Sequence, residues 1–316
     1  MILQFAKSPP PIGGITIHIK RLVAGLKDKE SIDVEILDYS RERNFKVIFI
    51  KIFRAKVIHI HLSRESLRFF FVILFKLLFK KVIITFHGKK DFSNKFDLLS
   101  ILIANKSIVL NKFTLNKAKK ITNKVIQIGA FLPPLNMSST NSLNKSSIVE
   151  IEKMKAIYNN CFSINAWKVV FDQNKQEIYG GSLLVEIFKE SSNIGLVFSD
   201  PTGQYKEFLT NKFKVIPENI LFINYSHDFI DVINITDCTI RSTTTDGDPL
   251  SVKESLYFNK DAICSNIIER PIGAIVYFDK SDLEEKLINY NSYQGEFKKY
   301  IHEDNLKKLT QIYQTV

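Results

Sequence analysis

Residues 241–258 read RSTTTDGDPLSVKESLYF, and this stretch carries the clearest signal for the fold. The short apolar run before it, residues 238–240, predicts a β-strand, and the small, polar and acidic residues that follow predict a tight loop. We expect Asp248 to be the N-cap of a helix and Pro249 its first residue, because both residue types favour these positions. A strand, a loop and a helix in this order form the repeating unit of a parallel α/β sheet.

The start of this predicted helix is suited to binding a phosphate. The first turn of a helix leaves backbone N–H groups without partners and carries a partial positive charge. Two carboxylates bracket it, Asp246 in the loop and Glu254 eight residues later in the helix. A nucleotide-sugar, with phosphate in its middle and hydroxyl groups at both ends, matches this spacing. The simpler interpretation is a capped helix, in which Asp248 and Ser251 only cap and Glu254 is solvated.

Strands alternate with helices in two halves of the same architecture. The expected strands are residues 1–7, 32–37, 57–62, 82–86, 107–110, 125–128, 166–171, 194–198, 220–223, 238–240, 261–264 and 274–278. The expected helices are residues 15–26, 45–53, 67–80, 98–104, 113–120, 181–189, 204–212, 227–233, 250–258, 283–288 and 304–313. Two prolines at 133–134 and a Ser/Asn-rich run to residue 147 predict a domain boundary.

We therefore predict an α/β protein of two Rossmann-like domains facing a cleft, residues 1–145 and 146–316. The terminal helix is a candidate to pack back on the first domain. Ligands of such sheets bind at the carboxyl ends of the strands. This rule selects the loops at residues 13–14, 61, 87–88, 198–203 and 242–248.

The charge of the chain is unevenly distributed. The 316 residues carry a formal net charge of +11; residues 1–145 contain 26 Lys and Arg against 9 Asp and Glu (26 − 9 = +17), and the remainder contains 18 against 24 (18 − 24 = −6). The first half is therefore expected to face an anionic partner: nucleic acid, an acidic membrane surface or an anionic substrate. The basic residues are not interleaved with aromatic residues in a nucleic-acid-binding motif, so we expect no nucleic acid.

Several features point to a cytoplasmic protein. The sequence shows no run of 18 apolar residues and no secretory signal pattern, so we expect neither a spanning helix nor export. The three cysteines are far apart and match no metal-binding spacing, which favours a reducing compartment and no metal. The apolar stretch 67–81 is interpreted as domain core, with an interfacial role as the alternative because basic residues flank it.

The motifs, taken in order, resemble a known family. Residues 11–14 read PIGG, residues 85–88 read TFHG, residues 246–256 read DGDPLSVKESL and residues 270–277 read RPIGAIVY. This order resembles the retaining GT-B glycosyltransferases of family 4, in the branch that builds bacterial surface polysaccharides such as capsule or lipopolysaccharide. The resemblance implies a UDP-sugar donor on the second domain, a saccharide or lipid-linked acceptor on the first, hexosyl or HexNAc transfer with retention, and no metal or other cofactor.

The resemblance also implies roles for individual residues. Asp246 would contact the hydroxyls of the transferred sugar, Glu254 the ribose hydroxyls, and His87 would lie beside the reacting carbon. The implied donor-binding residues are Gly13, Gly14, Lys175, Arg241, Thr245, Gly247, Asp248, Leu250, Ser251 and Lys253. The chain departs from the family where a lysine that contacts the diphosphate is expected, because Tyr179 occupies that position. We expect Lys175 or Arg241 to compensate.

Two alternatives remain at this stage. One is a UDP-sugar epimerase of the same fold, which would need no acceptor. The other is a basic, non-enzymatic protein that binds nucleic acid or a membrane. For the enzyme itself, the basic first half predicts peripheral attachment to the inner face of the cell membrane. We also expect His59 and His61 to face opposite sides of their strand, with His59 toward the core and His61 toward the cleft.

Overall fold

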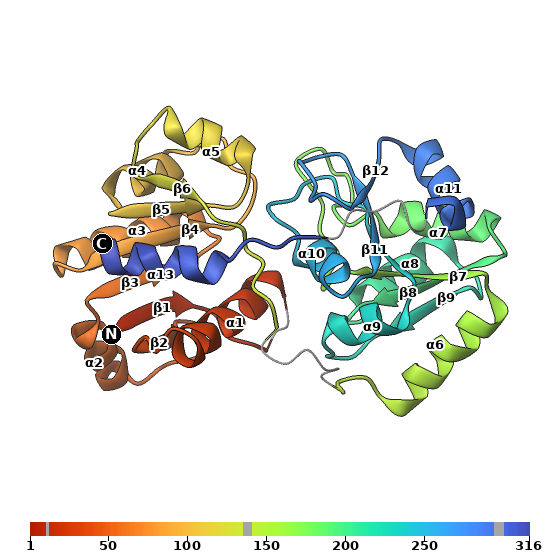
Figure 1. The fold of residues 1–316 in the computed structure, drawn as a ribbon, viewed down its shortest axis with the longest axis horizontal. Coiled ribbons are helices and arrows are strands. Elements are labelled where there is room, and N and C mark those ends of the chain that lie inside the picture. The colour runs from red at the N-terminus through yellow and green to blue at the C-terminus, as the bar shows by residue number, and fades with distance from the viewer. Residues whose placement is uncertain (11–12, 135–140, 294–299) are drawn as a thin grey trace. The chain divides into compact units, whose positions relative to one another are not determined.

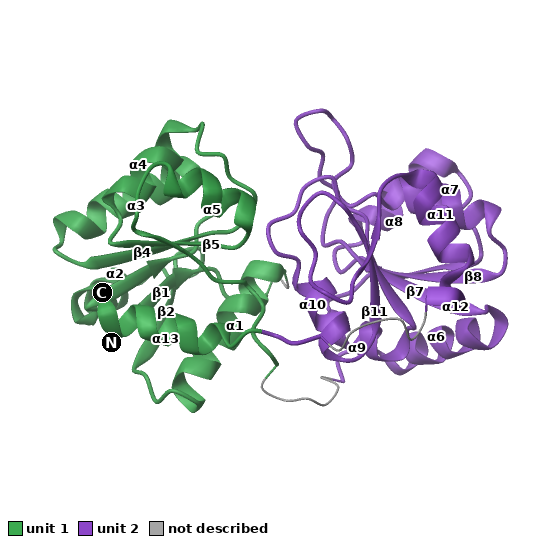
Figure 2. Cartoon of the chain, turned by 45° about the horizontal axis from the view of Figure 1, so that its top comes forward, with its two compact units in different colours: residues 1–135, 303–316 green, residues 136–302 purple. Residues whose placement is uncertain are grey.

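The computed structural model describes residues 1–10, 13–134, 141–293 and 300–316, and it divides into two compact units. Unit 1 comprises Met1–Leu135 together with Glu303–Val316, and unit 2 comprises Asn136–His302 (Figure 2). Each unit contains a six-stranded sheet whose recorded strand pairs are all parallel, with helices packed on it (Figure 1). The predicted α/β fold with two Rossmann-like domains is confirmed.

The sheet of unit 1 has the strand order β2-β1-β3-β4-β5-β6. Its strands are β1 (Ile2–Ala6), β2 (Val34–Asp38), β3 (Val57–Ile60), β4 (Lys81–Phe86), β5 (Lys106–Val109) and β6 (Val125–Gln127). Its helices are α1 (Gly14–Asp28), α2 (Phe45–Arg54), α3 (Glu65–Leu77), α4 (Lys95–Ile103), α5 (Lys112–Lys119) and α13 (Asn305–Thr315). The chain order reverses between β1 and β3, so the loops after these two strands flank the point where ligands of doubly wound sheets bind.

The sheet of unit 2 has the order β12-β11-β10-β7-β8-β9. Its strands are β7 (Asn160–Asn165), β8 (Ile194–Ser199), β9 (Ile220–Ile223), β10 (Cys238–Arg241), β11 (Asp261–Ser265) and β12 (Ile275–Tyr277). Its helices are α6 (Lys145–Ile157), α7 (Gly181–Glu190), α8 (Gln204–Phe213), α9 (Phe229–Ile235), α10 (Leu250–Tyr257), α11 (Lys280–Ile288) and α12 (Tyr290–Tyr293). Here the chain order reverses between β7 and β10. The loop that follows β10, residues 242–248, therefore lies beside the point where ligands of such sheets bind.

The last helix, α13, belongs to unit 1 although it follows unit 2 in the chain. Leu309, Ile312 and Tyr313 share a buried apolar cluster with Leu22 and Leu26 of α1. Figure 1 shows α13 lying across the sheet of unit 1. Because α13 is packed in the core of this unit, the unit needs both ends of the chain to be complete.

The division between the units lies earlier than the boundary expected after residue 145. Ser142 already packs in unit 2, where its Oγ donates to Asp231 Oδ2 at 2.6 Å, and Leu143 belongs to a buried cluster of that unit. Residues 135–140, which are part of the Ser/Asn-rich run that predicted the boundary, lie outside the described residues, as do residues 11–12 of the PIGG motif.

The secondary structure just after the boundary differs from the prediction at one strand and one helix. A strand was expected at residues 166–171, but β7 occupies 160–165, and α6 was not predicted. The segment NCFSIN was missed because half its residues are polar, yet the buried Ser163 hydroxyl finds hydrogen-bond partners on neighbouring segments. Ser163 Oγ lies 3.3 Å from Thr239 Oγ1 and accepts from Thr236 Oγ1 at 3.0 Å.

None of the helices in the described ranges combines the length and apolar character that crossing a membrane requires.

Candidate functional site

The loop between β10 and α10 lies at the carboxyl edge of the sheet in unit 2, as predicted, but its helix begins differently. Pro249 is the N-cap, with φ −70° and ψ 118°, and Leu250 is the first helical residue. Asp248 was expected to cap the helix; instead its carboxylate forms an ion pair with Lys253 Nζ at 2.5 Å. Because Pro249 has an extended ψ, Asp248 lies outside the helix and pairs with the Lys253 side chain instead of capping. Pro249, the N-cap, has no side-chain group that could accept a hydrogen bond from the first turn.

The start of α10 therefore presents backbone N–H groups to which no capping side chain is hydrogen-bonded. Ser251 lies in this first turn, is buried, and its Oγ has no hydrogen-bond partner among the residues that the structure describes. A buried hydroxyl without a partner is uncommon in folded proteins and is costly. A phosphate oxygen binds to groups of this kind: the uncapped N–H groups of a helix start, the positive end of the helix dipole and a hydroxyl without a partner.

Asp246 is the centre of a buried ionic cluster. Its carboxylate pairs with Arg241 (Nε to Oδ2, 3.1 Å) and with Arg270 (Nη1 to Oδ2, 3.1 Å). It also accepts from Thr243 Oγ1 and from the backbone N–H of Gly247. Burial alone would raise the pKa of Asp246, but the charges and hydrogen bonds of the two arginines outweigh it and lower that pKa overall.

These bonds decide what Asp246 does in this structure. Arg241 Nη2 also donates to Oδ1 at 3.3 Å, so both carboxylate oxygens accept more than one hydrogen bond. A carboxylate offers about four acceptor positions. Asp246 is therefore occupied in orienting two guanidinium groups, and its contact with a sugar hydroxyl stays a prediction.

Arg270 was missed by the sequence analysis. Its side chain is buried, and besides Asp246 it donates to Ser265 O (2.7 Å) and Ser265 Oγ (3.1 Å). The rule that ligand loops follow strand ends could have found it, because Arg270 lies in the loop after β11 and β11 pairs with β10. The RPIGAIVY motif was noted, but no role was assigned to its first residue.

The loop after β7 carries Tyr179, at the position where the family resemblance predicts a lysine, and Lys175, one of the two residues expected to compensate. Tyr179 replaces the expected lysine, and the guanidinium carbon of Arg241 lies 5.4 Å from the centroid of its ring. Of the two candidates to compensate, Arg241 lies in the Asp246 cluster, whereas Lys175 is exposed on a turn at φ +60°. Tyr179 thus supports the position of Arg241 by a cation–π contact.

Gly180 explains how closely the loops after β7 and β10 approach each other. Its φ is +65°, and a Cβ atom placed there would lie 2.4 Å from Ser242 Oγ and 2.6 Å from Ser242 O. Only glycine fits both the backbone conformation and this separation. The loops are further joined by the Thr244 N–H, which donates to Ile178 O at 3.0 Å.

The remaining predicted donor residues of unit 2 lie on the same loop and helix. Glu254 is buried in the second turn of α10, Leu250 is buried in the first, Gly247 is half-buried and Thr245 is exposed. The predicted donor-binding residues between 241 and 254 therefore lie together at one end of the sheet of unit 2. Lys175 is the one predicted donor-binding residue of this unit that lies outside this stretch.

Unit 1 contains a cluster of four histidines at the corresponding edge of its own sheet, of which His18, His59 and His61 are buried and His87 is half-buried. His87 follows β4, and its Nε2 lies 3.0 Å from Nδ1 of His61, which follows β3. The rings of His61 and His59 are 4.0 Å apart, and His18 of α1 lies 5.8 Å from His87 between ring centroids. Burial lowers the pKa of His59, His61 and His87 well below the ordinary value, and the neighbouring histidines lower it further.

The expectation that His59 and His61 point in different directions is wrong. Residues two apart on a strand face the same side of the sheet, and both rings are buried in one cluster. The H-x-H spacing itself places both side chains on one face, because side-chain direction repeats every two residues along a strand.

A chain of hydrogen bonds connects His87 to the last helix. His61 Nε2 lies 2.9 Å from Gln4 Oε1, Gln4 Nε2 donates to the Tyr313 hydroxyl at 3.0 Å, and that hydroxyl lies 2.6 Å from His59 Nδ1. Because an amide oxygen only accepts, His61 must carry its proton on Nε2, and its Nδ1 then accepts from His87 Nε2–H. Because desolvation lowers the pKa of His87 well below its ordinary value, His87 is neutral at pH 7 and its Nδ1 carries the lone pair.

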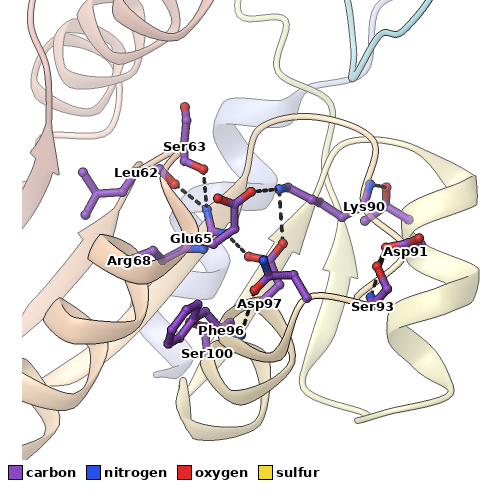
Figure 3. Close-up of polar contacts among 12 residues, drawn as sticks. Leu62, Ser63, Glu65, Arg68, Lys90, Asp91, Ser93, Phe96, Asp97 and Ser100 are labelled. Atoms are coloured by element: carbon purple, nitrogen blue, oxygen red, sulfur yellow. Dashed lines mark hydrogen bonds and ion pairs between the residues drawn. The ribbon is translucent and has the colours of Figure 1, made fainter. Parts of the chain in front are cut away.

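A second cluster fixes the segment that follows His87 (Figure 3). Lys90 Nζ pairs with Glu65 Oε1 at 2.6 Å and with Asp97 Oδ2 at 3.1 Å, and Asp97 also pairs with the buried Arg68. The Arg68 guanidinium in turn lies 4.7 Å from the centroid of the Phe86 ring, directly before His87. Residues from α3, α4 and the intervening loop thus hold the end of β4 in place.

Gly13 and Gly14 open α1, as the sequence predicted. Gly13 is extended (φ −157°), and a Cβ atom at either position would meet no described residue within 4 Å. Neither backbone strain nor crowding by the described residues accounts for two glycines here. Their small size keeps the start of α1 accessible, which is what a ligand approaching the backbone closely would need.

Among the described residues, no group of three or more His, Cys, Asp or Glu side chains is arranged to hold a metal ion. The expectation of a metal-independent reaction stays a prediction.

Comparison with known proteins gives structural matches only. No protein-family model matches the sequence, and no curated protein does. The structure is similar to HepE (Alr3699) from Anabaena, solved in complex with UDP-glucose, with a TM-score of 0.69, 9% sequence identity and full coverage of both chains. It is also similar to a sucrose-phosphate synthase from Thermosynechococcus elongatus (TM-score 0.68, 11% identity, 100% of this chain and 98% of that one).

A third solved structure, S. aureus MnaA with UDP, matches with a TM-score of 0.62 at 10% identity, over 99% of this chain and 97% of that one. These likenesses extend over both units and confirm the predicted GT-B fold. At such low identity they show the fold alone.

Proposed function

We propose that this protein is a glycosyltransferase that moves a hexosyl or HexNAc group from a UDP-sugar to a saccharide or lipid-linked saccharide acceptor. The observation that carries the proposal is the start of α10, where uncapped N–H groups and the unpartnered Ser251 hydroxyl lie two turns or less from the buried Glu254. A diphosphate at the helix start and ribose hydroxyls on Glu254 fit this geometry. HepE and MnaA, which share the fold, were solved with UDP or a UDP-sugar.

The chemistry requires groups of these types. Breaking the bond between sugar and diphosphate increases the negative charge on the leaving nucleotide in the transition state. Preoriented N–H groups and a helix dipole stabilise that charge without reorganising. The sugar carbon becomes positive at the same time, and a neutral imidazole such as His87 tolerates this charge better than a protonated one would.

The finer parts of the proposal follow from the family resemblance. They are transfer with retention of configuration, a place in bacterial surface polysaccharide synthesis, independence of metal ions, and a cytoplasmic location at the inner face of the cell membrane. The basic first half of the chain supports the last part, because a lipid diphosphate acceptor and an acidic bilayer are both anionic.

The proposal is tested by measuring the melting temperature of the protein with a panel of UDP-, GDP- and ADP-sugars. A ligand that binds only the folded state raises the melting temperature, and the shift grows with the logarithm of the ligand concentration relative to Kd. We expect a shift with UDP and with one UDP-sugar. Conversion of that UDP-sugar to its epimer without an acceptor would instead identify an epimerase, and no shift with any nucleotide would contradict the proposal.

Glu254→Gln is expected to weaken UDP binding by about ten- to a hundredfold, because hydrogen bonds to a charged acceptor are worth about 1.5–3 kcal/mol. Isothermal titration with UDP measures the change. The exposed Glu186 of α7 provides the matched control, since Glu186→Gln removes the same charge from another helix of unit 2. Equal UDP affinities for wild type and Glu254→Gln would show that this residue does not contact the nucleotide.

EDTA is expected to leave sugar transfer unchanged. Asp246 and Asp248 form the D-x-D pair of the sequence, but both carboxylates are paired with cations in the structure. Their charges are therefore compensated by arginine and lysine side chains. Turnover is measured with and without the chelator; a loss that manganese restores would contradict the metal-independent mechanism.

A further inference from the structure

Helix α2 exposes apolar side chains along its whole length. The exposed fractions of Phe45, Phe49 and Phe53 are 85%, 65% and 72%, and Ile50 is also exposed. None of the residues of α2 is fully buried. These phenylalanines recur every four residues and therefore follow one side of the helix. The core of unit 1 does not use them, and aromatic side chains in such a row mark an interaction surface.

The end of α3 extends this surface. Phe79, just after α3, is 95% exposed, and Leu77 and Leu78 beside it are exposed as well. Lys80 joins the two segments, because its Nζ donates to Phe53 O at 2.8 Å and lies 5.3 Å from the centroid of the Phe53 ring. The apolar patch, here called the α2–α3 patch, consists of Phe45, Phe49, Ile50, Phe53, Leu77, Leu78 and Phe79.

Basic residues surround the patch. Residues 41–56 contain six Lys and Arg residues against one acidic residue (6 − 1 = +5), and α2 itself contains no acidic residue. Lys46 is exposed between Phe45 and Phe49 in sequence, and the other exposed cations nearby are Arg41, Arg43, Arg54, Lys56 and Lys81. An apolar strip with cations beside it is the pattern of a helix that lies in a membrane interface.

Two partners could cover this apolar patch, a second copy of the protein or a lipid bilayer, and the charge around the patch distinguishes between them. In a symmetric dimer the same surface of two copies meets, so Lys46 and the other cations would face their own copies and repel. An anionic bilayer meets every one of these cations with the opposite charge. It also accepts the phenylalanine rings below the headgroups.

We propose that the α2–α3 patch inserts into the surface of an anionic lipid bilayer, with its phenylalanines among the acyl chains and its cations at the lipid phosphates. This deepens the membrane attachment included in the proposed function by naming the surface and by adding apolar insertion to charge attraction. Attachment is then expected to persist in part at high salt, because salt screens the charges but not the buried apolar area.

Tryptophan fluorescence tests the insertion directly. Phe49→Trp is prepared in the full chain, with Phe278→Trp as the matched control, since Phe278 is exposed to 70% in unit 2. Both proteins retain the native Trp167 as a common background. With vesicles of phosphatidylglycerol and phosphatidylcholine, the emission of Phe49→Trp should shift to shorter wavelength and be quenched by brominated acyl chains. Phe278→Trp should show neither change.

Co-sedimentation with the same vesicles separates apolar insertion from charge attraction. Replacing Phe49 and Phe53 by glutamine should weaken binding at least about tenfold, given the apolar area of two rings. Binding of wild type and of this double variant to equal extents would overturn the proposal, as would quenching in both tryptophan variants. A dimer in light scattering that the double variant abolishes would identify a second copy as the occupant instead. The UDP-induced melting shift of the double variant shows separately whether the proposed enzymatic function holds.

Discussion

Asp246→Ala is expected to lower the free energy of unfolding by roughly 3–5 kcal/mol, because removing one partner of a buried ionic cluster leaves the others uncompensated. Two guanidinium groups would lose their counter-charge here, those of Arg241 and Arg270, and the side chain of Arg270 is almost completely buried. The Thr243 hydroxyl and the Gly247 N–H would lose their acceptor as well. Urea unfolding of the full chain at pH 7 measures the loss.

Two comparisons make this measurement specific. Glu186, which forms an exposed ion pair with Lys280 in unit 2, is the matched control, and Glu186→Ala should cost less than about 1 kcal/mol as is usual for exposed pairs. Replacing Asp246, Arg241 and Arg270 together by leucine and methionines should cost much less than Asp246→Ala alone, because no charge stays buried. A loss below about 1 kcal/mol for Asp246→Ala would show that the arginines are solvated when unpaired.

The pH dependence has a definite sign. The folded-state pKa of Asp246 lies below its ordinary value, so the carboxylate contributes fully to stability above the unfolded value of about 3.9. That contribution falls as the pH drops from there toward the folded pKa. The difference in unfolding free energy between wild type and Asp246→Ala should therefore decrease on acidification below about pH 4.

The sequence predicted most strands and helices because apolar side chains recur with clear periods, and it predicted the end of the sheet at which residues 241–254 gather. It failed for β7, where the polar Ser163 is satisfied by Thr236 and Thr239 of a neighbouring segment. Such partners are distant in the chain and cannot be seen in the local composition. The local composition therefore favoured the mostly apolar residues 166–171, which follow β7, as the strand.

The partners of the site residues were harder to predict than the site itself. The pairing of Asp246 with Arg270 joins residues 24 positions apart, and the contact of Gln4 with Tyr313 joins residues 309 positions apart. Neither pair follows from spacing on one helix or strand. They arise from the strand order, which places β11 next to β10, and from α13 returning to the core of unit 1.

Unit 1 is expected to lose stability steeply between neutral and mildly acidic pH. His59 and His61 are buried and His87 is half-buried, and the loss of solvent lowers the folded-state pKa of each. A histidine that stays neutral when folded takes up a proton on unfolding once the pH is below about 6.5, so acid favours the unfolded chain. Each contributes up to about 1.4 kcal/mol per pH unit below that value, and the three together up to about 4 kcal/mol per pH unit.

Urea unfolding of the full chain at a series of pH values between 7.5 and 5 measures this slope. His61→Gln should reduce the slope by about a third, since one of the three titrating groups is lost. Tyr313→Phe is the control: it keeps every imidazole but removes the hydroxyl that bonds with Gln4 and His59. It should lower stability by about 1–3 kcal/mol for the buried groups left unsatisfied, and by the same amount at each pH. A slope that is the same in His61→Gln and wild type would show that this histidine is already protonated in the folded protein, and the neutral His61–His87 pair at the candidate site would have to be abandoned.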